Sequence, residues 1–228
     1  RFYAARLLPA NPIIRYDRAH HEAALCSAGV KMTDIEPVPA ATVVLIRENS
    51  RQQELEVLLV QRNSRLVFHG GHWVFPGGRL DDEDFGGNGS RSLEYPAALR
   101  AAVRETREEA GIEISEEQLI HTAHWTTPPK LPRRFCTWFF LCPLHEEVEV
   151  NVDNDEILDF RWLSPDAAIE AAENDSMILP RPTLTTLRDL SGHATLPSLL
   201  SGVAQAGIRV FPENSSYYRP VEMGCFSS

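Results

Sequence analysis

The sequence predicts a mixed α/β domain, because short apolar runs that end in turn residues alternate along the chain with longer segments of helix-forming residues. The chain has 228 residues, of which 43% are apolar and 24% charged, and this suits a globular domain with its own core. No run approaches 18 apolar residues, so we expect no membrane-spanning helix. We expect residues 1–31 to be an N-terminal extension and residues 32–228 to form a single domain that ends in helices.

The elements follow in chain order. Apolar runs predict strands at 41–48, 56–61, 118–125, 135–141 and 157–163. Helix formers predict helices at 97–110, 165–173, 183–190 and 197–206. The polar residues 49–53 predict a turn that joins the first two strands into a hairpin. Pro96 suits the first turn of the first helix, Gly111 suits its C-terminal cap, and Ser164 suits the N-terminal cap of the second. Residues 81–95 predict a flexible loop, and the last fifteen residues carry no readable pattern.

The charge balance limits the class of partner. A formal net charge of −10 argues against DNA or RNA as the main partner, because a nucleic-acid-binding surface needs an excess of basic residues. Small phosphorylated substrates stay compatible, because a bound divalent cation reverses the local charge. The four cysteines are scattered without a C-x-x-C pair or a zinc-like spacing, which is typical of a reducing compartment.

Residues 104–111, Arg-Glu-Thr-Arg-Glu-Glu-Ala-Gly, place three glutamates on one face of the first expected helix. Side chains three and four positions apart share a helical face, so Glu105, Glu108 and Glu109 gather there and Arg104 can pair with Glu108. Carboxylates this close repel one another unless a positive group compensates, and hard oxygen ligands suit Mg²⁺ or Mn²⁺. The alternative is a solvated charged face stabilised by ion pairs.

This stretch resembles the Nudix box, written G-x5-E-x7-R-E-U-x-E-E-x-G-U with U apolar. Gly78 takes the first position, residues 104–105 and 108–109 take the central ones, and residues 111–112 take the last. The preceding turn, residues 75–78 (Phe-Pro-Gly-Gly), is typical of Nudix proteins. The resemblance covers residues 40 to about 175 and implies a Nudix-type α/β/α sandwich, with a mixed β-sheet and the catalytic loop and helix on one face.

The sequence departs from that pattern at three places. Asp84 stands where the pattern has glutamate, and Thr106 stands at an apolar position. Nineteen residues (85–103) separate Asp84 from Arg104 where the pattern has seven, so twelve are inserted. The insertion falls in a loop, where closing the longer chain costs only about 1 kcal/mol. The three glutamates are unaffected by these departures. The departures therefore leave the role of Asp84 open, but they do not affect the expected metal site.

The resemblance implies a hydrolase of nucleoside-diphosphate-type pyrophosphates that depends on Mg²⁺ or Mn²⁺. It implies that Glu105, Glu108 and Glu109 are metal ligands, that one of them acts as base through metal-bound water, and that Arg104 orients a carboxylate. It also implies that Gly77 and Gly78 support the loop. For a further acid from a distant loop the candidates are Glu156 and the neighbouring pair Glu146 and Glu147, each of which is alternatively an ordinary surface acid.

The segment before the box narrows the substrate. Residues 58–65, followed by Gly71 and the glycine turn, resemble the same segment in coenzyme A diphosphatases, and the long insertion resembles the peroxisomal branch of those enzymes. The resemblance implies that CoA or acyl-CoA is the substrate and that Arg62 and Arg65 bind it. The loop between the expected strands 118–125 and 135–141 contains three cations that would meet the 3′-phosphate of CoA: Lys130, Arg133 and Arg134. The alternative is that this basic loop is merely solvated.

Two other functions stay open from the sequence. One is a broader hydrolase that acts on ADP-ribose, NADH or a dinucleoside polyphosphate, and the other is a non-catalytic nucleotide-binding module of Nudix type. The chain ends Cys-Phe-Ser-Ser without a peroxisomal tripeptide, so we expect a cytoplasmic location. The expected partner is a small nucleotide-type substrate, with no nucleic acid and no membrane, and a homodimer stays open.

Overall fold

The computed structural model describes residues 35–225, apart from residues 50, 52–53, 67–68, 87–92 and 130. Residues Ile35–Ser228 form a compact unit by themselves. The expected extension, residues 1–31, lies outside the described residues, so that division of the chain stays a prediction. Within the described part, each helix is too short or too polar to cross a bilayer.

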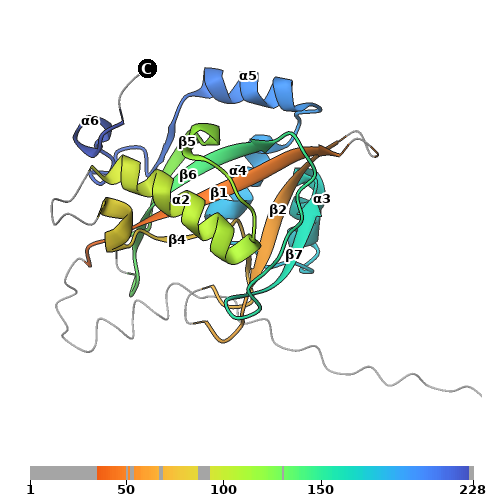
Figure 1. The fold of residues 1–228 in the computed structure, drawn as a ribbon, viewed down its shortest axis with the longest axis horizontal. Coiled ribbons are helices and arrows are strands. Elements are labelled where there is room, and N and C mark those ends of the chain that lie inside the picture. The colour runs from red at the N-terminus through yellow and green to blue at the C-terminus, as the bar shows by residue number, and fades with distance from the viewer. Residues whose placement is uncertain are drawn as a thin grey trace, which may run out of the picture. The chain divides into compact units, whose positions relative to one another are not determined.

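A mixed sheet of eight strands forms the centre of this unit (Figure 1). The strands are β1 (Val38–Asn49), β2 (Glu54–Arg62), β3 (Trp73–Val74), β4 (Gly77–Arg79), β5 (Ile120–Thr126), β6 (Phe135–Leu144), β7 (Ile157–Leu163) and β8 (Arg209–Phe211). The main path runs β3-β2-β1-β6-β5-β8, with β4 paired to β1 and β7 paired to β2. The pairs β1–β6 and β5–β8 are parallel and the others antiparallel, which confirms the predicted mixed α/β fold.

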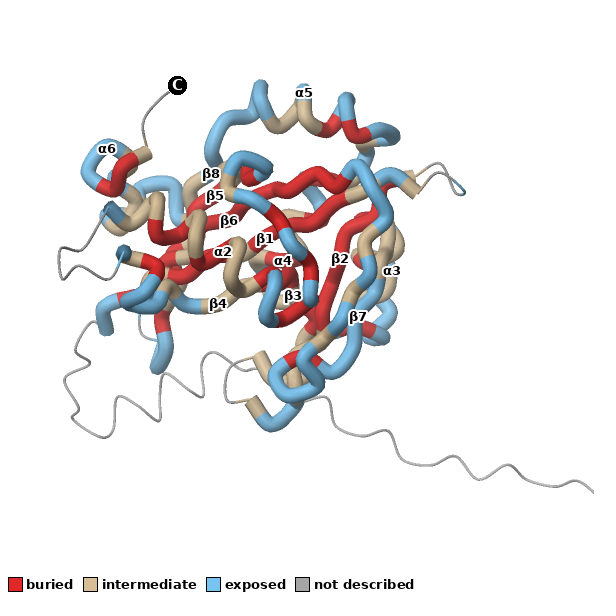
Figure 2. Tube along the Cα trace, viewed as in Figure 1, coloured by how far each residue is buried: buried red, intermediate tan, exposed pale blue. Residues whose placement is uncertain are grey.

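Helices cover both faces of the sheet. They are α2 (Glu94–Ala110), α3 (Pro165–Glu173), α4 (Arg181–Leu190), α5 (Leu196–Ala206) and α6 (Pro220–Met223), with short 3₁₀ turns at Asp82–Phe85 and Glu116–Gln118. Because side chains alternate along a strand, Val43 and Leu45 of β1 pack in the cluster under α2, whereas Val44 and Ile46 pack in the cluster with α3, α4 and α5. The buried chain in Figure 2 follows the central strands between these two layers.

Small residues allow α2 to lie close to the sheet. Ala98, Ala101 and Ala102 are fully buried on the helix face that meets the strands, so little side-chain volume separates the two backbones. Gly111 ends the helix in the left-handed conformation at φ 68°, as expected for its C-terminal cap. The helix begins at Glu94 rather than at residue 97, because a proline anywhere in the first turn removes no helical hydrogen bond.

Strands β3, β4 and β8 and helix α6 were not predicted from the sequence. Strand β8 is three residues long and pairs in parallel with β5, so its hydrogen bonds depend on a partner more than eighty residues earlier in the sequence (Ala123↔Arg209). Helix α6 spans only Pro220–Met223 and lies in the segment without a readable pattern. The expected loop 81–95 also contains the 3₁₀ turn Asp82–Phe85 and the first residues of α2.

Candidate active site

The glycine turn brings the backbone of β4 against the glutamates of α2. Gly78 pairs with Ala41 of β1, and a Cβ atom on Gly78 would lie 2.3 Å from Oε1 of Glu105. Gly77 has φ 153°, and a Cβ there would lie 2.3 Å from the carbonyl oxygen of Ala41. Gly77 therefore requires glycine for its backbone conformation and its close approach to β1, whereas a side chain at Gly78 would displace the Glu105 carboxylate.

Glu109 is the most enclosed of the three glutamates, with 4% of its surface exposed. The Gly77 N–H donates a hydrogen bond of 2.8 Å to its Oε2, and Nη1 of Arg62 lies 3.3 Å from its Oε1. Burial raises the pKa of Glu109 to about 8, although the Gly77 N–H and Arg62 both act to lower it. The carboxylate therefore has less positive compensation than its burial requires.

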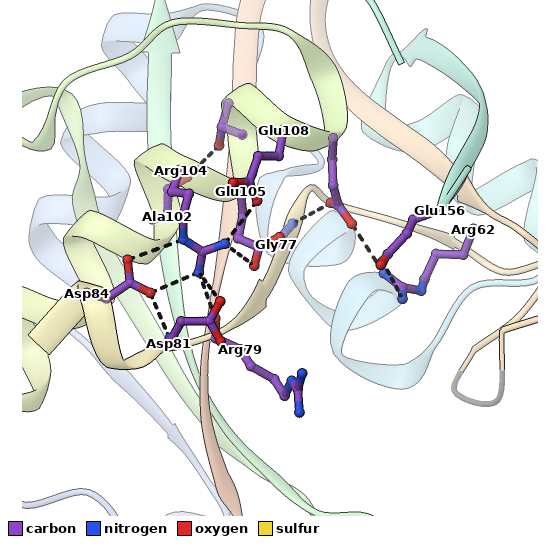
Figure 3. Close-up of polar contacts among 12 residues, drawn as sticks. Arg62, Gly77, Arg79, Asp81, Asp84, Ala102, Arg104, Glu105, Glu108 and Glu156 are labelled. Atoms are coloured by element: carbon purple, nitrogen blue, oxygen red, sulfur yellow. Dashed lines mark hydrogen bonds and ion pairs between the residues drawn. The ribbon is translucent and has the colours of Figure 1, made fainter. Parts of the chain in front are cut away.

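Arg104 holds the other two glutamates, as Figure 3 shows. Its Nη1 lies 2.8 Å from Glu105 and 3.0 Å from Glu108, and its Nη2 donates to the backbone carbonyl of Arg79. The same Nη2 lies 2.9 Å from Oδ2 of Asp84, which is 5% exposed. The hydrogen bond to Asp84, with the nearby glutamates, holds the pKa of Arg104 above its ordinary range. Arg104 thus contacts the carboxylates of Glu105 and Glu108 and is itself bound by Asp84, and its role in orienting metal ligands stays a prediction.

Two of the three departures from the Nudix pattern, Asp84 and Thr106, have a physical account in the structure. Asp84 reaches Arg104 despite its shorter side chain, because the 3₁₀ turn in which it lies brings it next to α2. Arg100, one helical turn before Arg104, donates from Nε to the Asp84 carbonyl at 2.6 Å. This second contact with Asp84 was not predicted from the sequence, although the four-residue spacing of Arg100 and Arg104 indicates that they share a helical face. Thr106 is buried, and its hydroxyl donates to the Ala102 carbonyl at 2.7 Å, so no polar group is left unpaired.

Arg62 connects the helix to a distant loop. Its Nη1 contacts Glu109, and its Nη2 lies 3.6 Å from Glu156, a candidate for the distal acid (Figure 3). The loop is tied to the end of β2, because the Asn63 N–H donates to the Glu156 carbonyl and the Asn63 side chain donates to Asp155. The structure therefore brings Glu156 into the neighbourhood of the glutamate helix, while Glu146 and Glu147 are exposed.

The predicted substrate-binding cations have different surroundings. Arg65 and Arg133 are exposed, and Lys130 lies outside the described residues. Arg134 is only 4% exposed, and its guanidinium donates to the backbone carbonyls of Ile35 and Thr127. These backbone contacts favour a structural role for Arg134, and its contact with a substrate phosphate stays an untested prediction.

The donor set fits a divalent cation in its chemistry. Three glutamates share one helical face, and burial raises the pKa of both Glu105 and Glu109, so a nearby positive charge would stabilise their charged forms. As the side chains stand, the described part of the chain contains no group of three His, Cys, Asp or Glu residues arranged to hold a metal ion. Arg104 and Arg62 contact oxygens of the same glutamates that would serve as metal ligands.

Comparisons with known proteins agree with this geometry. The model of the NUDIX domain family matches residues 36–181. The putative nudix hydrolase 7 of Caenorhabditis elegans is 25% identical over 187 residues, which are 67% of this chain and 60% of that protein. The peroxisomal coenzyme A diphosphatase ndx-8 of the same organism is 33% identical over 97 residues, 40% of this chain and 37% of that protein.

Two further similarities are to a human protein and to a solved fold. The human acyl-coenzyme A diphosphatase NUDT19 is 38% identical over 77 residues, 33% of this chain and 20% of that protein. These three curated relatives are thus matched over 60% of their length or less. The crystal structure of a NUDIX hydrolase from Alicyclobacillus acidocaldarius has the same fold, with a TM-score of 0.65 and 23% identity over 73% of this chain and 96% of that one. Because the family model spans well over half of the sequence and includes the glycine turn and the whole glutamate helix, the chain belongs to the NUDIX domain family.

Proposed function

We propose that this protein is a divalent-metal-dependent hydrolase that cleaves the pyrophosphate bond of a nucleoside-diphosphate-linked substrate. One observation carries the proposal: α2 places Glu105 and Glu109 directly against the glycine turn, with the Gly77 N–H bound to Glu109. NUDIX hydrolases generally use divalent metal ions, and we assign Glu105, Glu108 and Glu109 as the ligands of Mg²⁺ or Mn²⁺.

The chain's own residues would orient these ligands and add positive charge. When bound, the metal ion supplies charge neutralisation on the phosphate oxygens and a more acidic water molecule. Gly77 fixes Glu109 through its N–H, and Arg104, held by Asp84, fixes Glu105 and Glu108. We propose Glu156 as the distal acid, because Arg62 lies between it and Glu109.

We propose CoA or acyl-CoA as the preferred substrate. Support comes from the two similar proteins whose names specify coenzyme A or acyl-coenzyme A diphosphatase, each matched over less than half of this chain. Arg62 and Arg65, on β2 and the loop after it, and Lys130 and Arg133, in the loop between β5 and β6, are the proposed substrate contacts. The broader hydrolase of ADP-ribose, NADH or dinucleoside polyphosphates is the alternative within the same reaction class.

A substrate panel tests both levels of the proposal. Purified protein is incubated with CoA, acetyl-CoA, ADP-ribose and NADH, each with Mg²⁺, with Mn²⁺ and with a chelator, and the phosphorylated products are separated by chromatography. We expect metal-dependent cleavage with the highest kcat/KM for CoA or acyl-CoA. A preference for ADP-ribose or NADH would contradict the CoA assignment and leave the reaction class intact.

A non-catalytic module is the competing class of function. The contacts of Arg104 and Arg62 with the glutamates are the observation that favours it, since they neutralise the carboxylates without an ion. Absence of turnover of every substrate with either metal, together with measurable nucleotide binding by calorimetry, would support this module and overturn the hydrolase.

A further inference from the structure

The segment between β2 and β3 brings a histidine next to Arg62 through an irregularity in the sheet. The Gly71 N–H donates to the Arg62 carbonyl at 2.9 Å, and the Arg62 N–H donates to the His72 carbonyl at 3.0 Å. Gly71 and His72 therefore both lie opposite Arg62. Gly71 is in the left-handed region at φ 77°, so the irregularity is a β-bulge of the glycine type. Such bulges change the direction of a side chain and are frequent beside functional sites.

Strand alternation assigns the face on which His72 lies. Trp73 pairs with Gln61 and belongs to the core cluster shared with α3, α4 and α5, whereas Val74 packs in the cluster under α2. Since successive side chains point to opposite faces, His72 shares the α2 face with Val74. It is thus the cross-strand neighbour of Arg62 on the face where Arg62 contacts Glu109.

The imidazole of His72 is held by one ring nitrogen. Nδ1 donates to the Gly70 carbonyl at 3.1 Å, because a carbonyl can only accept. His69 packs edge-on against the ring, with centroids 5.0 Å apart and an interplanar angle of 62°. The side chain is half-buried, and among the residues that the structure describes no hydrogen bond engages its Nε2. The ring is therefore oriented while one polar atom stays available.

We propose that His72 is a substrate-contacting residue, whose Nε2 donates a hydrogen bond to a phosphate oxygen of the bound pyrophosphate beside Arg62. The inference rests on the proposed function and extends it. Because Nδ1 donates to the Gly70 carbonyl, this hydrogen bond requires a hydrogen on both ring nitrogens. No bond is formed or broken by His72, so its contribution is to substrate affinity.

Two substitutions distinguish this role from a structural one. The amide nitrogen of glutamine reaches about as far as Nε2, whereas that of asparagine reaches about as far as Nδ1. We expect His72→Ala and His72→Asn to raise KM roughly ten- to a hundredfold with little change in kcat, the range for a hydrogen bond to a charged group. We expect His72→Gln to restore most of the affinity. Rescue by His72→Asn and not by His72→Gln would mean that the bond to Gly70 is what matters, and it would overturn the proposal.

A matched control and a binding measurement complete the test. His193, in the segment between α4 and α5, is replaced by alanine, and we expect KM to stay unchanged. Normal turnover with unchanged KM in His72→Ala overturns the inference and leaves the proposed function intact. If the wild-type protein turns over no substrate, the proposed function fails. Calorimetric binding of inorganic pyrophosphate then decides the inference, and equal affinities for wild type and His72→Ala would overturn it.

Discussion

The two ends of α2 both enclose ionisable side chains, but they stabilise them in different ways. Near the C-terminal end, Glu105 and Glu109 are paired with guanidinium groups and with a backbone N–H. Near the N-terminal end, Glu94 accepts from the Trp138 indole at 2.9 Å, and two histidines lie among aromatic rings. At one end the carboxylates lie against cationic and N–H groups, whereas at the other end the two histidines lie mainly against aromatic rings.

Among the residues that the structure describes, His124 has no polar compensation for its ring. His124 is fully buried between Trp138 and Tyr218, each with its ring centroid 4.9 Å away, and within the described residues neither of its ring nitrogens has a hydrogen-bond partner. Burial lowers the pKa of both His121 and His124 to about 4, so both are neutral at pH 7. The difference teaches that substitutions at the carboxylate end should alter chemistry, whereas those at the aromatic end should alter stability.

Glu109→Gln is expected to have the largest effect and tests the carboxylate end. The amide keeps an oxygen for the Gly77 N–H but loses the charge, so we expect kcat to fall roughly a thousandfold or more, with unfolding free energy changed by about 1 kcal/mol or less. Kinetics and urea unfolding measure the two quantities. The exposed Glu117→Gln is the control, and activity retained in Glu109→Gln would remove its assigned role.

Acid should destabilise the protein through the aromatic end. The folded-state pKa of each histidine lies below its value of 6.5 in the unfolded chain, so stability is full above pH 6.5 and is lost as pH falls toward 4. The full shift corresponds to about 3 kcal/mol per histidine. Burial raises the pKa of Glu94, Glu105 and Glu109, which changes stability in the opposite direction and offsets part of this loss.

Urea unfolding between pH 7.5 and 4.5 measures this dependence, and His124→Phe isolates one histidine. Phenylalanine suits the aromatic surroundings and does not titrate, so we expect the acid-induced loss to shrink by up to the contribution of one histidine, about 3 kcal/mol. Glu94, Glu105 and Glu109 are present in both proteins and cancel in the comparison. An unchanged pH dependence in His124→Phe would mean that His124 is not neutral in the folded protein.

One end of α2 could be predicted from the sequence and the other could not, for a physical reason. Helical spacing places Glu105, Glu108 and Glu109 on one face whatever surrounds the helix, so local sequence was sufficient. The aromatic end draws on four segments far apart in the chain, through Tyr95, His121, Trp138 and Tyr218, and each alone resembles an ordinary core residue. The same limit applies to Arg62, because only the folded sheet brings it to Glu109.

The substitution Arg134→Ala tests the same distinction between chemistry and stability, and its expected effect is smaller. Arg134 immediately precedes β6. The first residue of β6 pairs with Val38 of β1, and Val38 lies four residues before Thr42, which pairs with Gly77 of the glycine turn. Its loss leaves two backbone carbonyls without a donor, so we expect a stability decrease of about 1–3 kcal/mol. We expect an unchanged ratio of kcat/KM for CoA and dephospho-CoA.

The exposed neighbour Arg133→Ala serves as the control, with stability unchanged within about 0.5 kcal/mol. Because Arg133 remains a proposed substrate contact, this variant should lower the preference for CoA over dephospho-CoA. If Arg134→Ala instead lost CoA cleavage selectively, the buried Arg134 would have a role in substrate binding. The distinction between residues that affect chemistry and residues that affect stability would then fail.

Thr106→Val should have the smallest effect, because the residue lies in the interior of α2, where neither kind of charge stabilisation applies. The hydroxyl bonds only to the Ala102 carbonyl of the preceding turn, and valine has nearly the same shape. The lost hydrogen bond and the gained apolar burial oppose each other, so we expect unfolding free energy within about 0.5 kcal/mol of wild type and kcat within about twofold. Urea unfolding and steady-state kinetics measure both. A loss of activity at unchanged stability would show that the hydroxyl also sets the position of the neighbouring Glu105, and the polar residue at this apolar position would then belong to the site.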